Sequence, residues 1–194
     1  MLMQEEQALM ERCRNGDREA FYKLVEPLLD RVYSASAAIL RSTHLAEDAV
    51  QNAMIEAYRA IMNGKEIRSF AGWFKHLCAM RAIDLARKRS RLNRMTEDLE
   101  HLEPVDQGAQ PIEALLKKEE QHRLLSQVMS LDIQHRSVIL LFYYQEMSIE
   151  EISAALGVKE GTVKSRLHRA RHKLLKLYQS TDNRKVMMNV GYKD

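Results

Sequence analysis

The chain has 194 residues and a formal net charge of +3 at pH 7, a length that allows one or two domains with cores of their own. No apolar run approaches the ~20 residues of a membrane-spanning helix, and the first residues lack the basic and apolar blocks of a signal peptide. We therefore expect a cytoplasmic protein that does not insert into membranes. Cys13 and Cys78 are too few for a disulfide framework or a structural zinc cluster. We expect both cysteines to be small, partly buried apolar groups, and we expect no metal or other cofactor.

Charge is unevenly distributed along the chain. Residues 64–94 contain nine lysines or arginines and two acidic residues, and residues 147–178 contain seven against three. Residues 95–121, between them, contain eight acidic residues and two lysines. Local clusters of positive charge bind a phosphate backbone, because counterion release depends on the charge near the phosphates. We therefore predict two nucleic-acid surfaces separated by an acidic segment that avoids DNA.

Helical signals follow one another through the first half of the chain, and no stretch alternates as a strand would. A first helix is predicted over 4–15. Asp17 is placed to cap a second helix, in which Pro27 is expected to cause a kink or a break. Further helices are predicted over 32–40, 45–62 and 70–91. The last of these is capped by Ser69 and preceded by a left-handed stop at Asn63-Gly64.

The helical pattern then gives way to an acidic segment that contains Pro104, Gly108 and Pro111. This composition is typical of a flexible linker. We therefore predict an all-α fold of two small helical domains joined by a flexible linker. The expected boundaries are 1–94 for the first domain, 95–111 for the linker, 112–180 for the second domain and 181–194 for a tail.

The second domain ends in a helix-turn-helix pattern. Ser148 and Glu151 have the capping-box spacing that opens a helix, and Gly157 allows a tight stop. The helix that follows is basic except for an apolar stripe of Val163, Leu167, Ala170 and Leu174. Such a helix can bury its stripe against the first helix and place its basic face in a DNA major groove. A solvated basic helix in a bundle is the alternative interpretation.

Two further patterns lie in the first domain. The basic segment 64–94 also contains aromatic residues such as Trp73. Basic side chains bind the phosphates of an unpaired DNA strand, and aromatic side chains stack on its bases, so the segment suits such a strand. The spacing of Trp73 to Leu77 suits a buried stripe equally well. The preceding predicted helix carries a polar strip formed by Asp48, Gln51, Asn52 and Glu56. The strip could bind a basic partner, or it could be an ordinary face exposed to solvent.

Four segments together resemble the bacterial RNA polymerase sigma factors of the extracytoplasmic-function (ECF) type. The resemblance runs from about Gly16 to Tyr178. It is carried by GDREAFYKLV (16–25), LAEDAVQNAMIEAYRA (45–60), FAGWFKHLCAMRAIDLARKR (70–89) and GTVKSRLHRAR (161–171). Three residues depart from the family pattern: Asn52, where Glu is usual, Met54, where an aromatic residue is common, and Met80, where many members have Asn. Because of the departure at Met80, the resemblance does not specify which −10 sequence the chain would recognise.

The resemblance implies a transcription initiation factor with three partners: core RNA polymerase, promoter DNA and an anti-sigma factor. It implies that segment 45–60 binds the largest polymerase subunit through Asp48, Gln51, Asn52 and Glu56. It also implies that segment 70–89 melts and reads the −10 element, for which we expect contacts from Trp73, Lys75, Met80, Arg81, Arg87, Lys88 and Arg89. Segment 161–171 would read the −35 element, where we expect contacts from Thr162, Lys164, Ser165, Arg166, Arg169, Arg171 and Lys173.

Two other classes of protein are weighed against this interpretation. A one-component regulator that binds an operator could carry the same helix-turn-helix, but it would not need the basic block at 64–94. A nucleic-acid enzyme would need a nucleophile motif, a phosphate-cradling glycine loop or a carboxylate cluster for paired metals, and the sequence has none of these. We therefore predict that the chain is not an enzyme.

Overall fold

The computed structural model describes residues 2–96 and 119–190, and these ranges contain helices and no strands. The first range forms α1 (Leu2–Arg14), α2 (Arg18–Leu40), α3 (Thr43–Met62) and α4 (Phe70–Thr96). The second forms α6 (Glu119–Ser130), α7 (Ile133–Ile139), a π-helical turn η1 (Leu140–Tyr144), α8 (Ile149–Leu156) and α9 (Glu160–Val190). The predicted all-α class is confirmed.

Helices α2 and α4 begin at the caps that the sequence predicts, Asp17 and Ser69, and α3 begins at a cap that was not predicted, Ser42. Asp17, Ser42 and Ser69 accept hydrogen bonds from backbone N–H groups in the first turns of α2, α3 and α4, at 3.1, 3.3 and 3.3 Å. These bonds satisfy donors that have no partner within the helix. The start of α4 has a second cap, because the carboxylate of Glu6 in α1 accepts from the N–H groups of the first two α4 residues at 2.8 and 3.2 Å.

The predicted break at Pro27 does not occur, because α2 runs as one helix from Arg18 to Leu40 with Pro27 inside it. Buried side chains lie on both sides of the proline, including Val25 and Val32 at 0% and 1% exposure. Their packing holds both halves of the helix in place and outweighs the lost backbone hydrogen bond. The predicted helix over 32–40 is therefore the second half of α2.

One hydrophobic cluster joins the four N-terminal helices. It contains Met10 and Cys13 of α1, Val25 of α2, Ile61 of α3 and Phe74 of α4, each at most 1% exposed. Phe70 and Phe74 stack with ring centroids 5.6 Å apart. The face of α4 that points toward α1 is therefore fixed, and its basic side chains lie on the remaining faces.

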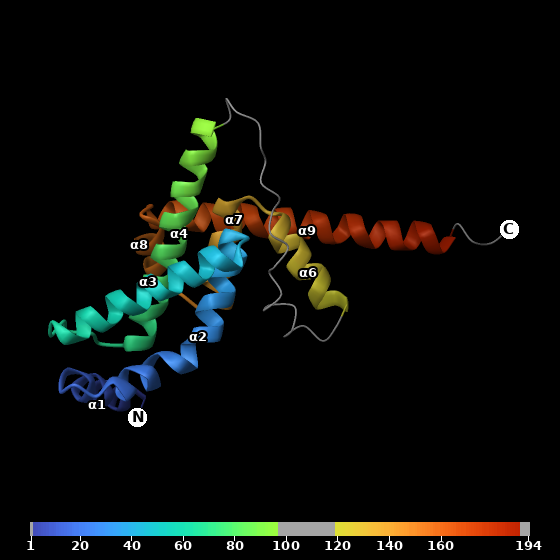
Figure 1. Ribbon diagram of the computed structural model, residues 1–194. Helices are drawn as coiled ribbons and strands as arrows, with labels where there is room; N and C mark the ends of the chain where they lie inside the picture. The colour runs from blue at the N-terminus through green and yellow to red at the C-terminus, as the bar shows by residue number, and fades with distance from the viewer. Residues whose placement is uncertain (1, 97–118, 191–194) are drawn as a thin grey trace.

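The C-terminal helices form a second unit that packs directly against the first. A single cluster of buried residues includes Ile39 of α2, Ile83 of α4, Val138 of α7, Ile152 of α8 and Leu167 of α9. Figure 1 shows the N-terminal half of α9 among the other helices, while its C-terminal half extends away from them as a long rod. The two predicted domains are present, and in this structure they share a core.

The predicted boundaries fall partly outside the described residues. The linker expected over 95–111 lies almost wholly outside them, because α4 ends at Thr96 and α6 begins at Glu119. The predicted tail begins at 181, whereas α9 continues to Val190.

Candidate nucleic-acid interface

The α8–α9 pair has the geometry of a helix-turn-helix. The hydroxyl of Ser148 accepts from the backbone N–H of Glu151 at 3.1 Å, and the Glu151 carboxylate accepts from the N–H of Ser148 at 2.7 Å. This completes the predicted capping box. At the other end of α8, Gly157 takes a left-handed conformation with φ of 60°. Helix α8 is thus capped at both ends, and the turn to α9 begins at Gly157.

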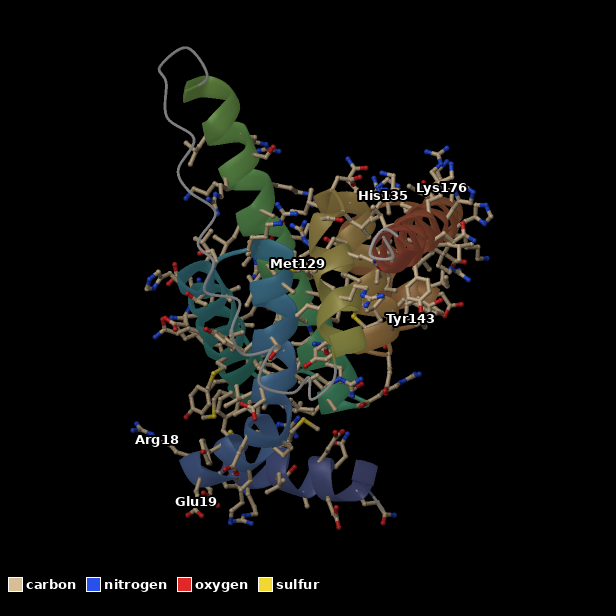
Figure 2. All side chains as sticks on the ribbon, turned by 90° about the vertical axis from the view of Figure 1, so that its right-hand side faces the viewer. Arg18, Glu19, Met129, His135, Tyr143 and Lys176 are labelled. Atoms are coloured by element: carbon tan, nitrogen blue, oxygen red, sulfur yellow. The ribbon has the colours of Figure 1, made fainter. Side chains whose placement is uncertain are left out.

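Helix α9 buries its apolar stripe as predicted. Val163, Leu167 and Ala170 are at most 1% exposed, and Leu174 packs partly buried against the same core. The faces that remain are basic, and Figure 2 shows nitrogen-bearing side chains radiating from this helix. An exposed basic face opposite a buried stripe is what a major-groove helix requires.

The residues predicted to contact the −35 element differ in solvent exposure and in the contacts that they make within the chain. Lys164, Ser165 and Arg169 are exposed on the N-terminal half of α9, and Arg171 and Lys173 are exposed further along. The Lys173 ammonium forms an ion pair with Asp132 at 2.9 Å. Thr162 and Arg166 are half-buried.

Asp132 connects α9 to the start of α7. Its carboxylate caps α7 by accepting from the backbone N–H of His135 at 3.2 Å, and it also contacts the His135 ring at 2.7 Å. Partial burial acts to raise the pKa of Asp132, but the hydrogen bonds from Lys173 and His135 outweigh it and hold that pKa below its usual range. The carboxylate is therefore ionised at neutral pH, and it keeps Lys173 beside α7.

The residues predicted to contact the −10 element lie along α4 and form two groups by exposure. Arg87 and Lys88 are exposed. The others are half-buried: Trp73, Lys75, Met80, Arg81 and Arg89. Trp73 packs edge-on against Phe70 with centroids 6.3 Å apart, under the ammonium of Lys65 at 5.0 Å. Trp73 thus forms part of the core boundary, as its helical spacing also allowed.

The polar strip predicted to bind polymerase lies along one face of α3. Asp48, Gln51 and Asn52 are exposed, while Ala49, Ala53 and Ala57 on the opposite face are buried. Glu56 differs from the other three members, because its carboxylate accepts two hydrogen bonds from the guanidinium of Arg81 on α4, at 2.5 and 3.0 Å. The strip and the basic block therefore meet at this pair.

A groove lies beside the Glu56–Arg81 pair. Its volume is about 540 Å³, and its lining includes Asn52, Glu56, Arg81 and Lys88. The groove thus lies between residues expected to bind polymerase and residues expected to bind DNA. Charges of both signs line it.

Several residues that hold the two units together were missed from the sequence. Arg136 of α7 is 4% exposed and donates to the backbone oxygen of Ile39 at 2.9 Å. Gln145 is 2% exposed and donates to the backbone oxygen of Arg31 at 2.7 Å. Helical periodicity could have indicated Arg136, because Ile139 and Leu140 follow it at three and four residues on the same face. Nothing in the local sequence indicates Gln145.

Other predicted features can be located in the described part of the chain. Cys13 and Cys78 are buried at 1% and 2% exposure, and burial raises the pKa of the Cys78 thiol to about 12. No group of three or more His, Cys, Asp or Glu side chains within the described ranges could hold a metal ion. Among the same residues, no helix is both long and apolar enough to span a membrane.

Comparison with known proteins identifies the family. Residues 24–92 match the family described as Sigma-70 region 2, and residues 121–174 match Sigma-70, region 4. The chain is 31% identical over 174 residues to the ECF RNA polymerase sigma factor SigW of Bacillus subtilis (strain 168), an alignment that covers 86% of this chain and 93% of SigW. The chain belongs to the ECF RNA polymerase sigma factors. It is therefore a promoter-recognising factor, and the operator-binding alternative is not favoured.

Two solved structures share the fold of this sigma factor. The structure of CnrH in complex with the cytosolic domain of CnrY matches with a TM-score of 0.60 at 24% identity, covering 91% of this chain and 98% of that chain. The sigma factor RpoE in complex with the anti-sigma factor NepR from Bartonella quintana matches with a TM-score of 0.60 at 22% identity, covering 82% and 96%. At these identities the likeness concerns the fold.

Proposed function

We propose that this sigma factor uses three surfaces of one chain to start transcription. The exposed basic face of α9 reads the −35 element as duplex, the basic face of α4 holds the opened −10 strand, and the polar strip on α3 binds core polymerase. The observation that carries the proposal is the pairing of a helix-turn-helix, with its stripe buried, and a second basic helix in the same chain. An operator-binding regulator needs only the first of these.

Within α9 the proposal assigns base contacts to the N-terminal half. Lys164, Ser165 and Arg169 are exposed there, and the first residues of a recognition helix are the ones that reach base edges. Arg171 and Lys173 lie further along, where contacts go to the backbone phosphates. Each bidentate base contact contributes ~1–3 kcal/mol of discrimination, whereas phosphate contacts carry little sequence information.

Within α4 the proposal assigns the exposed cations Arg87 and Lys88 to the opened strand. A protein that binds the unpaired strand lowers the free-energy cost of melting without using ATP, because it stabilises the product of melting. Trp73 is tied into the core boundary, so its contribution would be to hold the start of α4 in place.

We also propose an anti-sigma factor as a partner and the cytoplasm as the place of action. The support is the similarity of this fold to CnrH and RpoE, whose structures are complexes with CnrY and the anti-sigma factor NepR. A factor that works with polymerase on the chromosome acts in the cytoplasm, and none of the partner surfaces assigned here implies a catalytic step.

Run-off transcription with purified core polymerase on genomic DNA tests the proposal. Core polymerase with the chain is expected to start at a small set of sites that share upstream elements, and core alone is not. Binding of the chain to DNA without any core-dependent start site would instead favour the operator-binding regulator.

A further inference from the structure

Four of the residues predicted to contact the −35 element form one row along α9. They follow one another at intervals of four, three and four residues, the spacing of neighbours on one helix face: Thr162, Arg166, Arg169 and Lys173. The first residues of α7 border this row. Arg166 lines a cavity of about 310 Å³ together with Ile133 and Gln134 of α7. Lys173 contacts Asp132, which caps the same helix. The charge of Asp132 therefore acts directly on one end of the row.

The last residue of the row is already paired within the chain. Nζ of Lys173 donates to Oδ2 of Asp132 at 2.9 Å and lies 3.5 Å from Nδ1 of His135. The same carboxylate accepts from the backbone N–H of His135 at 3.2 Å, and Nδ1 of that ring lies 2.7 Å from each carboxylate oxygen. Figure 2 shows His135 beside α9. The first turn of α7 thus holds Asp132 in place, and Asp132 holds Lys173.

The pair changes what Lys173 can contribute to DNA binding. A free lysine that contacts a phosphate releases counterions from the DNA, which is the main source of sequence-independent affinity. Lys173 and Asp132 together carry no net charge, so the intact pair neutralises no phosphate. If Lys173 moves to a phosphate, it leaves behind a carboxylate whose side chain is 50% exposed, and the phosphates repel that charge. In both states the DNA is bound less tightly than by a lysine with no carboxylate beside it.

We propose, on the basis of the proposed function of α9, that Asp132 competes with the DNA backbone for Lys173 and thereby limits the affinity of the −35 surface. Asp132 is a positioning residue, because it acts on DNA through Lys173. The row that is available to DNA then ends at the exposed Arg169, one helical turn before Lys173. Phosphate contacts carry little sequence information, so Asp132 limits binding to promoter DNA and to unrelated DNA by the same factor.

Removal of the charge at residue 132 tests this competition. Asp132→Asn keeps a side chain that caps α7, because Asn and Asp cap helices about equally well, but it leaves Lys173 without this anionic partner. Holoenzyme assembled with the variant is expected to bind a promoter fragment found by the run-off experiment up to about eightfold more tightly at ~0.1 M salt, and the plot of log K against log salt is expected to steepen by ~0.9, the slope of one phosphate contact. Fluorescence anisotropy over a series of KCl concentrations measures both quantities.

A double-mutant cycle with Lys173→Ala separates this competition from general charge repulsion. Without Lys173, Asp132→Asn is expected to raise the affinity by at most about twofold and to leave the slope unchanged, because only a screened repulsion between the carboxylate and the DNA remains. An equal gain with and without Lys173 would show that Asp132 acts through its charge alone, and the proposal would be wrong. No gain in either background would show that Asp132 only caps α7, which also overturns the proposal.

A second substitution and a second DNA fragment keep the outcomes distinct. Asp132→Ser also retains a capping side chain, so it replaces Asp132→Asn if that variant melts at a lower temperature than the wild type. A fragment with a scrambled −35 element is expected to give the same gain as the promoter fragment.

The two fragments also separate this proposal from the proposed function. If wild-type holoenzyme does not prefer the promoter fragment, the proposed function fails. The cycle then still decides the role of Asp132, because counterion release does not depend on sequence. If the chain does not assemble with core polymerase, the proposed function fails as well, and the same cycle is measured with the chain alone on duplex DNA.

Discussion

Nη2 of Arg81 lies 2.5 Å from Oε2 of Glu56, and this ion pair joins α4 to α3. Arg81 also contacts Asp84 at 3.3 Å within its own helix. The sequence predicts that Glu56 binds polymerase and that Arg81 binds DNA, but in the free chain each is the other's partner. Glu56 therefore positions Arg81, and its role differs from that of the exposed members of the polar strip.

This relationship predicts different effects for two acidic residues of α3. Asp48→Asn should weaken binding to core polymerase and leave open-complex formation by the assembled holoenzyme unchanged. Glu56→Gln should chiefly impair open-complex formation, because Arg81 loses its anchor. An ion pair that stays in contact with solvent contributes ~0.2–1 kcal/mol, so the melting temperature should fall by no more than about 4 °C. Co-purification with core and permanganate reactivity of unpaired thymines measure the two effects. Equal loss of core binding in both variants would show that Glu56 is part of the polymerase surface.

The two basic helices should fail at different steps. Arg169→Ala on α9 should weaken promoter use by ~1–3 kcal/mol if it contacts a base, on an ordinary template and on one already melted around −10. Lys88→Ala on α4 should slow strand opening on the ordinary template, and the defect should shrink on the melted one. Both side chains are exposed, so neither change should affect folding. Run-off from matched templates measures this, and equal defects on both templates would contradict the division of labour.

Two glycines near the turn of the helix-turn-helix should respond in opposite directions to alanine. Gly157 has φ of 60°, and Gly161 lies inside α9. At both positions a Cβ would meet no atom within 4 Å apart from those of the adjoining backbone. Gly157→Ala should destabilise the fold by about 1 kcal/mol, because an L-residue is strained in the left-handed conformation. Gly161→Ala should stabilise it by ~0.4–1 kcal/mol by restricting the unfolded chain. Urea denaturation followed by circular dichroism measures both, and a shift of the same sign in both variants would count against the assigned turn.

The cysteines should report on opening of the N-terminal core. Cys13 and Cys78 are almost fully buried, and burial raises the pKa of both thiols. The thiolate is the reactive form, so alkylation by iodoacetamide at pH 8 should be slow in the native protein and fast in denaturant. Mass spectrometry after timed quenching measures the rates. Rapid native labelling of Cys78 would contradict the packing of α4 against α2.

Local features of this fold could be predicted from the sequence because short-range physics determines them. The Asp17 cap, the Ser148–Glu151 capping box and the buried stripe from Val163 to Ala170 each depend on residues within a few positions of one another. The bond from Arg136 to the carbonyl of Ile39 joins residues 97 positions apart, and no periodicity encodes such a pairing. The same limit applies to the candidate site. The sequence predicted which residues form the basic block and the polar strip, but it did not predict the ion pair between Arg81 and Glu56.

The cap that Glu6 provides for α4 shows that the folded N-terminal unit begins before the stretch that matches the Sigma-70 region 2 family. The stretch that matches the first sigma family begins at residue 24, yet α1 lies wholly before it and supplies Met10, Cys13 and the carboxylate that caps α4. A fragment cut where the similarity begins would expose Phe70 and Phe74 to water and leave the first N–H groups of α4 without acceptors. A helix that lies outside the matched stretch thus anchors the helix on which promoter opening is expected to depend.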